Sequence, residues 1–199
     1  MVEYDRWVDV LIVGGGPGGF AVARGYREAG GGGTVLLISA DEHPPYARPP
    51  LTKDYLRGES EAADLPLADE DWYRENAVEL RLGMPVLGID ADRKRAQLAD
   101  GSTVGYERLA LVTGSSPIPL PIPGADLPGL VYVRDRHSGE ALRGLAQAAD
   151  RVRAQSDRRP APPRRALGRG RRHGGDRWRE PRRGAQALGG RSRILVDYR

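Results

Sequence analysis

Short apolar runs, separated by glycine-rich and polar segments, recur along the first part of the chain. Residues 8–13 form an apolar run that ends at glycines, which is typical of a buried parallel strand. Residues 20–29 combine helix-forming residues with a polar face and predict a helix, and the apolar residues 34–39 predict the next strand. A strand, a helix and a strand in this order predict an α/β fold with a parallel sheet.

The pattern changes to shorter strands further along. Residues 86–89, 95–99, 103–106 and 108–112 predict four short strands, and Asp100-Gly101 predicts a hairpin turn among them. Residues 72–77 predict a short helix that uses Trp72 and Tyr73 for core packing. Alternating prolines over residues 117–123 predict an extended connection, and residues 140–150 predict an amphipathic helix. A small β-meander is therefore expected beside the parallel sheet.

Three glycines lie between the first predicted strand and the first predicted helix, in the pattern Gly14-x-Gly16-x-x-Gly19. Gly14 permits a tight turn, Gly16 leaves room for a pyrophosphate at the backbone, and Gly19 lets the helix pack close to the sheet. The helix N-terminus adds free N–H groups and a partial positive charge. A glycine-rich loop can match this pattern by chance, but its place between a strand and a helix favours dinucleotide binding.

An acidic pair, Asp41 and Glu42, follows the second predicted strand. A carboxylate at this place can accept hydrogen bonds from a ribose diol. The alternative for either residue is a solvated acid in a loop.

Residues 44–59, with the sequence PPYARPPLTKDYLRGE, form the most distinctive stretch. Its prolines predict an extended path, after which Thr52 can cap a helix that begins at Lys53. A segment stiffened in this way can hold a cation at a defined place. The simpler interpretation makes Lys53 and Asp54 surface residues of a first helical turn.

Charge divides the chain into two unequal parts. Residues 1–150 carry 15 basic and 23 acidic side chains, whereas residues 151–199 carry 16 basic side chains, all Arg, and 4 acidic ones. The chain contains no Cys, which excludes a disulfide framework, a thiolate metal site and a dithiol redox couple. It has neither an apolar run of about 20 residues nor the layout of a signal peptide, so we expect a soluble, cytoplasmic protein without a membrane partner.

Several segments together resemble the FAD-dependent pyridine-nucleotide oxidoreductases, and within them the ferredoxin and rubredoxin reductase branch. The segments are GGGPGG, PYARPPLTKDYLRG, ELRLGMPVLGID and LADGSTVGYERLALVTGSSP, and the resemblance covers roughly residues 7–150. It implies a Rossmann-like FAD-binding domain. It also implies Lys53 as the catalytic cation near the flavin with Arg48 beside it, and a pyrophosphate loop made of Gly14, Gly16, Pro17, Gly18 and Gly19.

The resemblance implies further contacts with FAD. Val86 matches the residue on the adenine side, Thr113 and Gly114 match the backbone turn against the cofactor, and Arg134 matches an arginine that approaches the flavin. Two positions depart from the family pattern. Val112 replaces a smaller Ala before that turn. The usual acid after the second strand falls at Ala40, which leaves Asp41 as its nearest substitute.

By resemblance, the expected activity is hydride transfer from NAD(P)H to FAD, followed by release of single electrons to a ferredoxin- or rubredoxin-type partner. The absence of Cys excludes the disulfide-reducing relatives, whose dithiol lies next to the flavin. No catalytic triad or metal-ligand cluster competes with this interpretation, because His43, His137 and His173 are isolated in sequence and are expected to lie in loops. No metal is expected.

The predicted domains are an N-terminal FAD-binding part over residues 1–134, a helix over 135–150 that leads toward a missing NAD(P)-binding domain, and an Arg/Gly/Pro-rich, disordered tail over 151–199. The family also requires a second glycine fingerprint and a return segment that completes the FAD site. We therefore expect this chain alone to bind FAD weakly or not at all and to lack NAD(P)H turnover.

Three explanations compete for the Arg-rich tail: a nucleic-acid-binding arm, a disordered linker, or a shift of reading frame in the gene. Moving the frame of residues 176–182 forward by one base permits I-G-G-G-[N/S]-L-G, a second glycine fingerprint. We favour this hypothesis over a nucleic-acid arm, since such an arm can also use Lys for phosphate contacts and the tail has none. The alternative function is a non-catalytic Rossmann-like binding module with a basic, nucleic-acid-binding tail.

Overall fold

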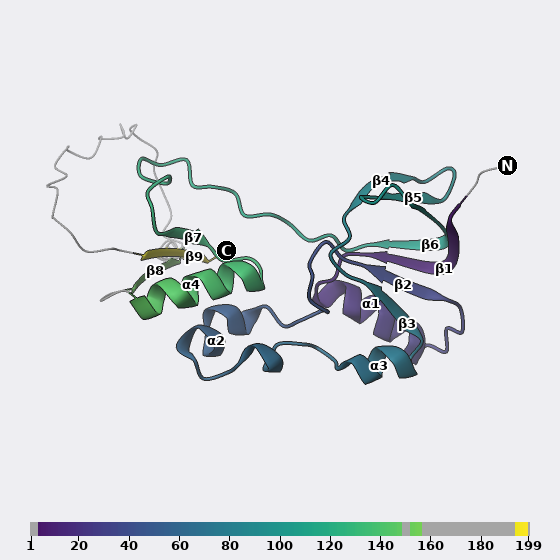
Figure 1. The fold of residues 1–199 in the computed structure, drawn as a ribbon, viewed down its shortest axis with the longest axis horizontal. Helices are drawn as coiled ribbons and strands as arrows, with labels where there is room; N and C mark the ends of the chain where they lie inside the picture. The colour runs from purple at the N-terminus through teal and green to yellow at the C-terminus, as the bar shows by residue number, and fades with distance from the viewer. Residues whose placement is uncertain (1–3, 149–151, 157–193, 199) are drawn as a thin grey trace, which may run out of the picture.

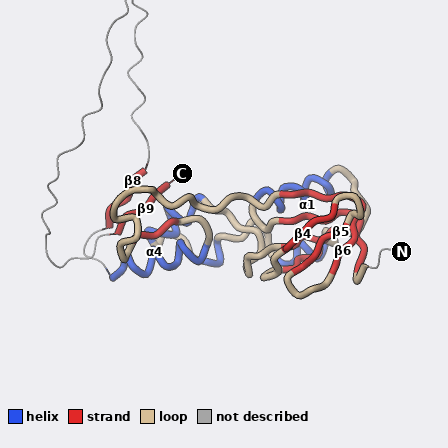
Figure 2. Tube along the Cα trace, turned by 90° about the horizontal axis from the view of Figure 1, so that it is seen from above, coloured by secondary structure: helices blue, strands red, loops and turns tan. Residues whose placement is uncertain are grey.

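The computed structural model describes residues 4–148, 152–156 and 194–198. Figure 1 shows the described elements in two groups. A large sheet with α1 and α3 forms one group, and α2, α4 and a small sheet form the other. The view from above in Figure 2 shows the two groups side by side along the long axis of the molecule, joined by loops.

Six strands form the large sheet, in the order β3-β2-β1-β6-β5-β4. The parallel part contains β1 (Arg6–Val13), β2 (Val35–Ile38), β3 (Val78–Arg81) and β6 (Thr103–Leu111). The antiparallel part contains β4 (Val86–Asp90), β5 (Arg95–Leu98) and the first residues of β6. The turn at Asp100-Gly101 joins β5 to β6 as predicted, and Gly101 has a φ of +85° there.

Both faces of β1 and β2 are buried along most of their length, which explains why these two strands are apolar runs. In β2 all four residues are buried: Val35 and Leu37 pack with α1 (Pro17–Glu28) and α3 (Glu70–Glu75), and Leu36 and Ile38 pack with residues of β4, β5 and β6. Figure 1 shows α1 and α3 on one side of the sheet and the β4–β5 hairpin on the other. The α/β, Rossmann-like fold with a small meander is therefore confirmed.

Two strands differ from the sequence prediction. The strands predicted at 103–106 and 108–112 are one strand, β6, because Glu107 continues the ladder and parallel pairing with β1 spans the whole segment. β3 was not predicted at all. Its alternate residues Glu79 and Arg81 are charged, since they lie at the edge of the sheet and pair with Arg6 and Asp100 respectively.

The second group begins with short helical segments: the 3-10 helix η1 (Pro49–Thr52), α2 (Asp54–Arg57) and the 3-10 helix η2 (Ala62–Asp64). It continues with β7 (Leu130–Tyr132) and α4 (Arg136–Ala148). Apolar side chains from these segments form two small clusters, one around Leu51 and Tyr55 and one around Leu142 of α4. The clusters pack α4 against residues 44–59, the proline-rich stretch that contains η1 and α2.

The predicted start of one helix was wrong. Lys53, and not Thr52, is the N-cap residue of α2, because the prolines direct residues 49–52 into a 3-10 turn. Helix α4 begins at Arg136, close to the start of the helix predicted over 135–150 and four residues before the amphipathic pattern at 140. Its first turn is held by Asp135 and Ser138, whose side chains bond to each other and to the backbone N–H groups of this turn.

Two segments of the Arg-rich tail form strands in the structure. β8 (Val152–Ser156) and β9 (Ile194–Tyr198) pair in parallel, and β9 also pairs with β7, in the order β7-β9-β8. These two segments were predicted to be disordered, but the structure places them in strands, because β9 pairs with both β7 and β8. Residues 157–193, including the 176–182 segment of the frame-shift hypothesis and His173, lie outside the described residues.

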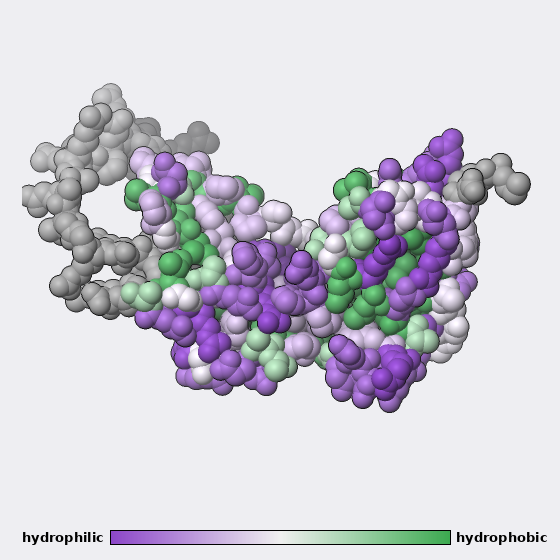
Figure 3. All heavy atoms as spheres, viewed as in Figure 1, coloured by the Kyte–Doolittle hydropathy of each residue, from purple (hydrophilic) through white to green (hydrophobic). Residues whose placement is uncertain are grey.

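Large apolar side chains reach the surface mainly on the connection between the two sheets. Leu111, Ile118, Ile122 and Leu127 are each more than half exposed. Figure 3 shows apolar surface on both groups of elements, interrupted by polar side chains between them. None of the described helices combines the length and the apolar character needed to cross a bilayer.

Candidate functional site

A cavity of about 600 Å³ opens at the carboxyl ends of β1 and β2. This is where an open parallel sheet places its ligands. Most of the predicted cofactor residues lie on its wall. They are Gly14, Gly16, Pro17, Gly18, Asp41, Arg48, Val86, Thr113, Gly114 and Arg134.

The three glycines of the fingerprint are needed for different structural reasons. Gly14 has a φ of +125°, and a Cβ there would collide with the carbonyl oxygen of Val112. A Cβ on Gly19 would collide with the carbonyl oxygen of Gly14, so this glycine lets α1 approach β1, as predicted. Gly19 supports the loop from behind and does not line the cavity.

Gly16 differs from the other two because its missing side chain leaves space for a ligand. It is the N-cap residue of α1 with a φ of −86°, a conformation open to any residue. The nearest atom to a Cβ there, apart from the chain neighbours, is Nη2 of Arg48 at 3.5 Å. The first turn of α1 has neither a side-chain cap nor an acidic residue, so its backbone N–H groups face the cavity with positive potential.

Two arginines supply further positive charge. Arg48 and Arg134 both line this cavity, and the Nε atom of each is buried with no hydrogen-bond partner among the described residues. A buried donor without a partner is costly, and its usual explanation is a ligand, an ion or water. Together with the free helix terminus and the space at Gly16, these donors fit a diphosphate group.

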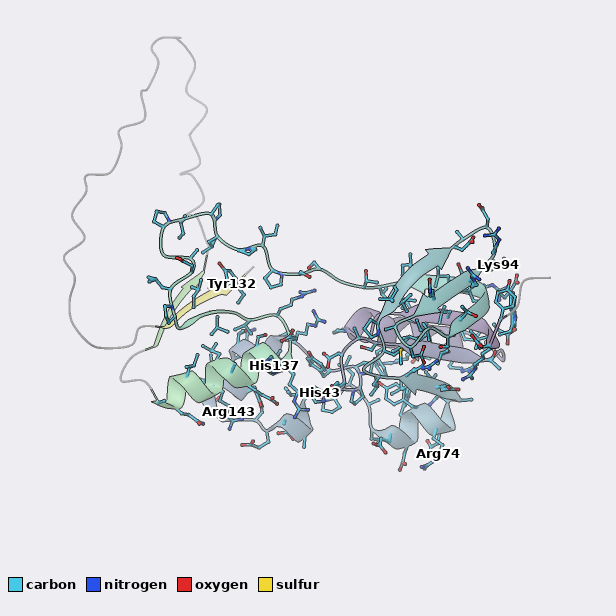
Figure 4. The ribbon with its side chains drawn as sticks, turned by 45° about the horizontal axis from the view of Figure 1, so that its top comes forward. His43, Arg74, Lys94, Tyr132, His137 and Arg143 are labelled. Carbon is cyan, nitrogen blue, oxygen red and sulfur yellow. The ribbon has the colours of Figure 1, made fainter. Side chains whose placement is uncertain are left out.

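The same two arginines also line a second cavity of about 420 Å³. Its other walls come from η1, the proline-rich connection and β7; they include Leu51, Thr52, Ile118, Tyr132 and Val133. Figure 4 shows Tyr132 on the segment that leads into α4. Arg48 and Arg134 therefore stand between two adjoining cavities, an arrangement that suits a nucleotide joined to a flat ring.

Asp41 is the acid nearest to Ala40, where the resemblance to the family leads us to expect a carboxylate. Both residues line the cavity beyond the end of β2. One carboxylate oxygen of Asp41 accepts the His43 N–H at 3.0 Å, and the other accepts the Tyr46 hydroxyl at 2.9 Å. A carboxylate has about four acceptor positions, so acceptor capacity remains for a ribose diol.

The opposite wall contains Val86 together with Thr113 and Gly114. Gly114 has a φ of +74°, and a Cβ there would lie 3.0 Å from Nη2 of Arg134. The side chain of Val112, which is larger than the family's Ala, lies against Gly18. The cavity thus keeps its opening despite this substitution.

Lys53 lies apart from both cavities. Its side chain is exposed at the start of α2, and it lines neither cavity. Its role beside a flavin therefore remains a prediction from the resemblance.

Two described histidines lie near the start of α4, as Figure 4 shows. His43 lies in a loop as expected, but His137 belongs to the first turn of α4, since this helix begins before the amphipathic pattern at residue 140. Within the described residues, no group of three or more potential ligands is arranged to hold a metal ion.

Several residues at the site were not predicted from the sequence, among them Met84, Pro85 and Tyr46. Met84 and Pro85 line the cavity beside Val86. Tyr46 lies behind Asp41 and is 3% exposed. The signal for Tyr46 was its position between the prolines of the 44–50 stretch, where an aromatic residue is held on a stiff backbone.

Comparison with known proteins identifies the family. The model of the pyridine nucleotide-disulphide oxidoreductases matches residues 8–157, which is most of the chain. The chain belongs to this family. Its members are flavin-dependent oxidoreductases that use FAD and NAD(P)H, in agreement with the resemblance seen in the sequence.

Similar curated proteins are reductases of small electron carriers. The chain is 36% identical over 135 residues to rhodocoxin reductase from Rhodococcus erythropolis, covering 68% of this chain and 32% of that protein. It is 38% identical over 134 residues to the ferredoxin–NAD(+) reductase subunit of the benzene 1,2-dioxygenase system of Pseudomonas putida, covering 67% and 32%.

Solved structures agree in fold. The putidaredoxin reductase–putidaredoxin complex aligns with a TM-score of 0.67 at 33% identity, over 77% of this chain and 37% of that one. The ferredoxin reductase of the CYP199A2 system from Rhodopseudomonas palustris aligns with a TM-score of 0.68 at 34% identity, over 73% and 36%. The chain thus spans about a third of the length of the relatives it matches.

Proposed function

We propose that this chain is the N-terminal, FAD-binding part of a reductase that passes electrons from NAD(P)H through FAD to a ferredoxin- or rubredoxin-type acceptor. Residues 1–134 would hold FAD, and the helix after residue 135 would lead toward the NAD(P)-binding part. One observation carries the proposal: the buried, unpartnered Nε atoms of Arg48 and Arg134 lie on the wall of a cavity at the open end of α1.

Different residues around the cavity would bind different parts of FAD. The N–H groups at the start of α1 and the guanidinium of Arg48 would bind the diphosphate. Asp41 would accept the ribose hydroxyls, and Val86 would lie against the adenine. Arg134, at the boundary of the two cavities, would approach the flavin ring, and Lys53 is proposed as the cation nearest to it. Bound FAD would accept a hydride from the nicotinamide and release single electrons.

The electron acceptor follows from chemistry as well as similarity. The chain lacks Cys, so it cannot form the dithiol of a disulfide reductase. A reduced flavin without that dithiol can pass single electrons directly to an external carrier. The similar proteins named above are reductases of ferredoxin-type carriers, which supports this class of partner.

FAD titration of the full chain tests the proposal. We expect weak binding, in the range of roughly 10 μM to 1 mM, because a site built from part of a family protein makes only some of the contacts. Gly16→Val should abolish this binding without unfolding the chain, since a side chain at this φ is unstrained and points toward the cavity. Chemical shifts in ¹⁵N NMR spectra report both binding and folding.

A matched control is Gly25→Ala, within the same helix. A Cβ there meets nothing within 4 Å, so FAD affinity should be unchanged. The proposal that this cavity holds FAD fails if Gly16→Val binds FAD like the wild type. NAD(P)H turnover should be absent from the chain alone.

A further inference from the structure

Tyr46 lies behind the cavity wall and joins three segments that are distant in sequence. Its backbone pairs with Pro66 in an isolated β-bridge, and the neighbouring bonds Ala47 N–H to Leu65 O and Leu67 N–H to Pro45 O, both 2.9 Å, fix this ladder. Its side chain packs against Leu51, Tyr55 and Leu65. The ring therefore has a rigid position before any ligand binds.

The hydroxyl group of Tyr46 makes two hydrogen bonds whose directions can be assigned. The backbone N–H of Arg136 can only donate, and it lies 2.9 Å from the Tyr46 oxygen. The single hydroxyl proton is then free for the Asp41 carboxylate, whose Oδ2 lies 2.9 Å away. Burial raises the pKa of Tyr46 to about 12, so the proton stays on the hydroxyl throughout the neutral range.

This bond orients Asp41 together with the His43 N–H on its other oxygen. The carboxylate would otherwise rotate about its side-chain bonds on a loop residue that is only partly buried. With both bonds present, each carboxylate oxygen of Asp41 has a donor within the protein. Tyr46 does not line the cavity itself and holds the carboxylate from behind.

We infer that Tyr46 is a positioning residue for nucleotide binding, which holds the Asp41 carboxylate toward the ribose of an adenine dinucleotide. The inference rests on the proposed function for its ligand. It adds that Asp41 binds the ribose only when the hydroxyl of Tyr46 holds its carboxylate in place. Tyr46 also bonds to the start of α4, so the same hydroxyl ties the ribose side of the cavity to the segment that carries Arg134.

The test compares FAD with FMN, which lacks the adenosine ribose. In the full chain, Tyr46→Phe should weaken FAD binding about three- to tenfold, as expected for loss of one bond to a charged group. It should leave FMN binding unchanged. In an Asp41→Asn background, Tyr46→Phe should have no further effect on FAD affinity, because the acid it positions is gone.

Tyr73→Phe is the matched control. Tyr73 is equally buried, and its hydroxyl has no hydrogen-bond partner among the described residues, so its removal should change neither affinity. Equal loss of FAD and FMN binding in Tyr46→Phe, or the same loss in the Asp41→Asn background, would indicate a general structural effect and overturn the inference. An unchanged FAD affinity in Tyr46→Phe beside a reduced one in Asp41→Asn would overturn it while leaving the proposed function intact.

A second measurement needs no ligand. In a crystal structure of Tyr46→Phe, the Asp41 carboxylate should leave its wild-type rotamer or occupy several. A carboxylate that keeps its place through the His43 N–H alone would contradict the inference, even if the wild-type chain failed to bind FAD and the proposed function fell.

Discussion

Ala77 has a left-handed backbone conformation that alanine disfavours. Its φ is 47°, at the position after the last helical residues of α3, and its methyl group is exposed. An L-residue loses about 1–2 kcal/mol in this region, and a glycine there costs about 0.5–1 kcal/mol through chain entropy. Ala77→Gly should therefore stabilise the chain by roughly 0.5–1 kcal/mol, measured by urea denaturation.

The control for Ala77 is the alanine at the end of α1. Ala29 has a φ of −80°, so Ala29→Gly relieves no strain and should destabilise the chain by up to about 1 kcal/mol. Equal effects of the two substitutions would mean that backbone conformation does not explain them.

Single residues also show where sequence reasoning succeeds. The glycine fingerprint and Asp41 were predicted from local features, a turn and a strand end, whereas Arg48 was implied by the resemblance to the family. Tyr46 and Met84 were missed, since their contribution depends on contacts with segments that only the folded chain brings near. Lys53 was selected by family pattern alone, and the structure leaves it outside both cavities.

Arg27 fastens helix α1 to the strands beside it. Its guanidinium donates to four backbone carbonyls: those of Gly31 and Gly33 after the helix, and those of Asn76 and Ala77 before β3. Lysine keeps the charge but cannot span these acceptors. Arg27→Lys should destabilise the chain by about 1.5–3 kcal/mol in chemical denaturation.

A neighbouring arginine on the same helix provides the comparison. Arg24 pairs with Glu28 at the surface, one turn further along. Exposed pairs of this kind contribute little, so Arg24→Lys should change stability by less than about 0.5 kcal/mol. A small effect at both positions would show that the carbonyls find other partners.

Asp9 links β1 to β2 in a way that depends on pH. The hydroxyl and the backbone N–H of Thr34 donate to the Asp9 carboxylate at 2.8 and 2.7 Å, and they hold the pKa of Asp9 below its ordinary value of 3.8. Because the pKa of Asp9 is lower in the folded chain than in the unfolded chain, its ionised carboxylate stabilises the fold at pH values above the unfolded-state pKa. This stabilisation is lost as the pH falls through the lower, folded-state pKa. The melting temperature should fall between about pH 5 and pH 3.

Asp9→Asn removes the titrating group, so the melting temperature of this variant should fall less over the same range. Thr34→Val, which lacks the hydroxyl donor, should shift the dependence in the same direction. An unchanged slope in Asp9→Asn would assign the acid sensitivity to the other described carboxylates with a lowered pKa, namely Asp5, Glu79, Asp90, Asp100, Asp135 and Glu140.

Elements were predictable where the hydrophobic pattern follows one period. β1, β2 and α1 are such cases, and the structure confirms them within a few residues. The sequence prediction missed β3 and divided β6 into two strands, because both features depend on pairing with neighbouring strands. An edge strand can have charged residues that pair across the sheet, and a polar residue can continue a strand that is paired on both sides.

At the scale of the whole molecule, the acidic and basic parts of the chain have different origins under our hypothesis. The coding DNA of residues 176–182 should contain, one base forward, a glycine fingerprint that continues in the same frame as family-like sequence. Sequencing the gene and its transcript checks this directly. A stop codon soon after the shift, or a forward frame without strand and helix patterns, would contradict it and favour a selected basic tail.

The glycine loop has a consequence for how such chains are recognised. Gly14 and Gly19 are required by neighbouring carbonyl groups of the protein itself, whereas a Cβ on Gly16 would make only an ordinary contact with the guanidinium of Arg48, at 3.5 Å. A descendant that had lost every use for a nucleotide would still be under selection to keep the first two, in order to remain folded, and would be free to change the third. Gly14 and Gly19 therefore indicate only that a chain has inherited this fold, whereas Gly16 indicates that the chain still binds a nucleotide.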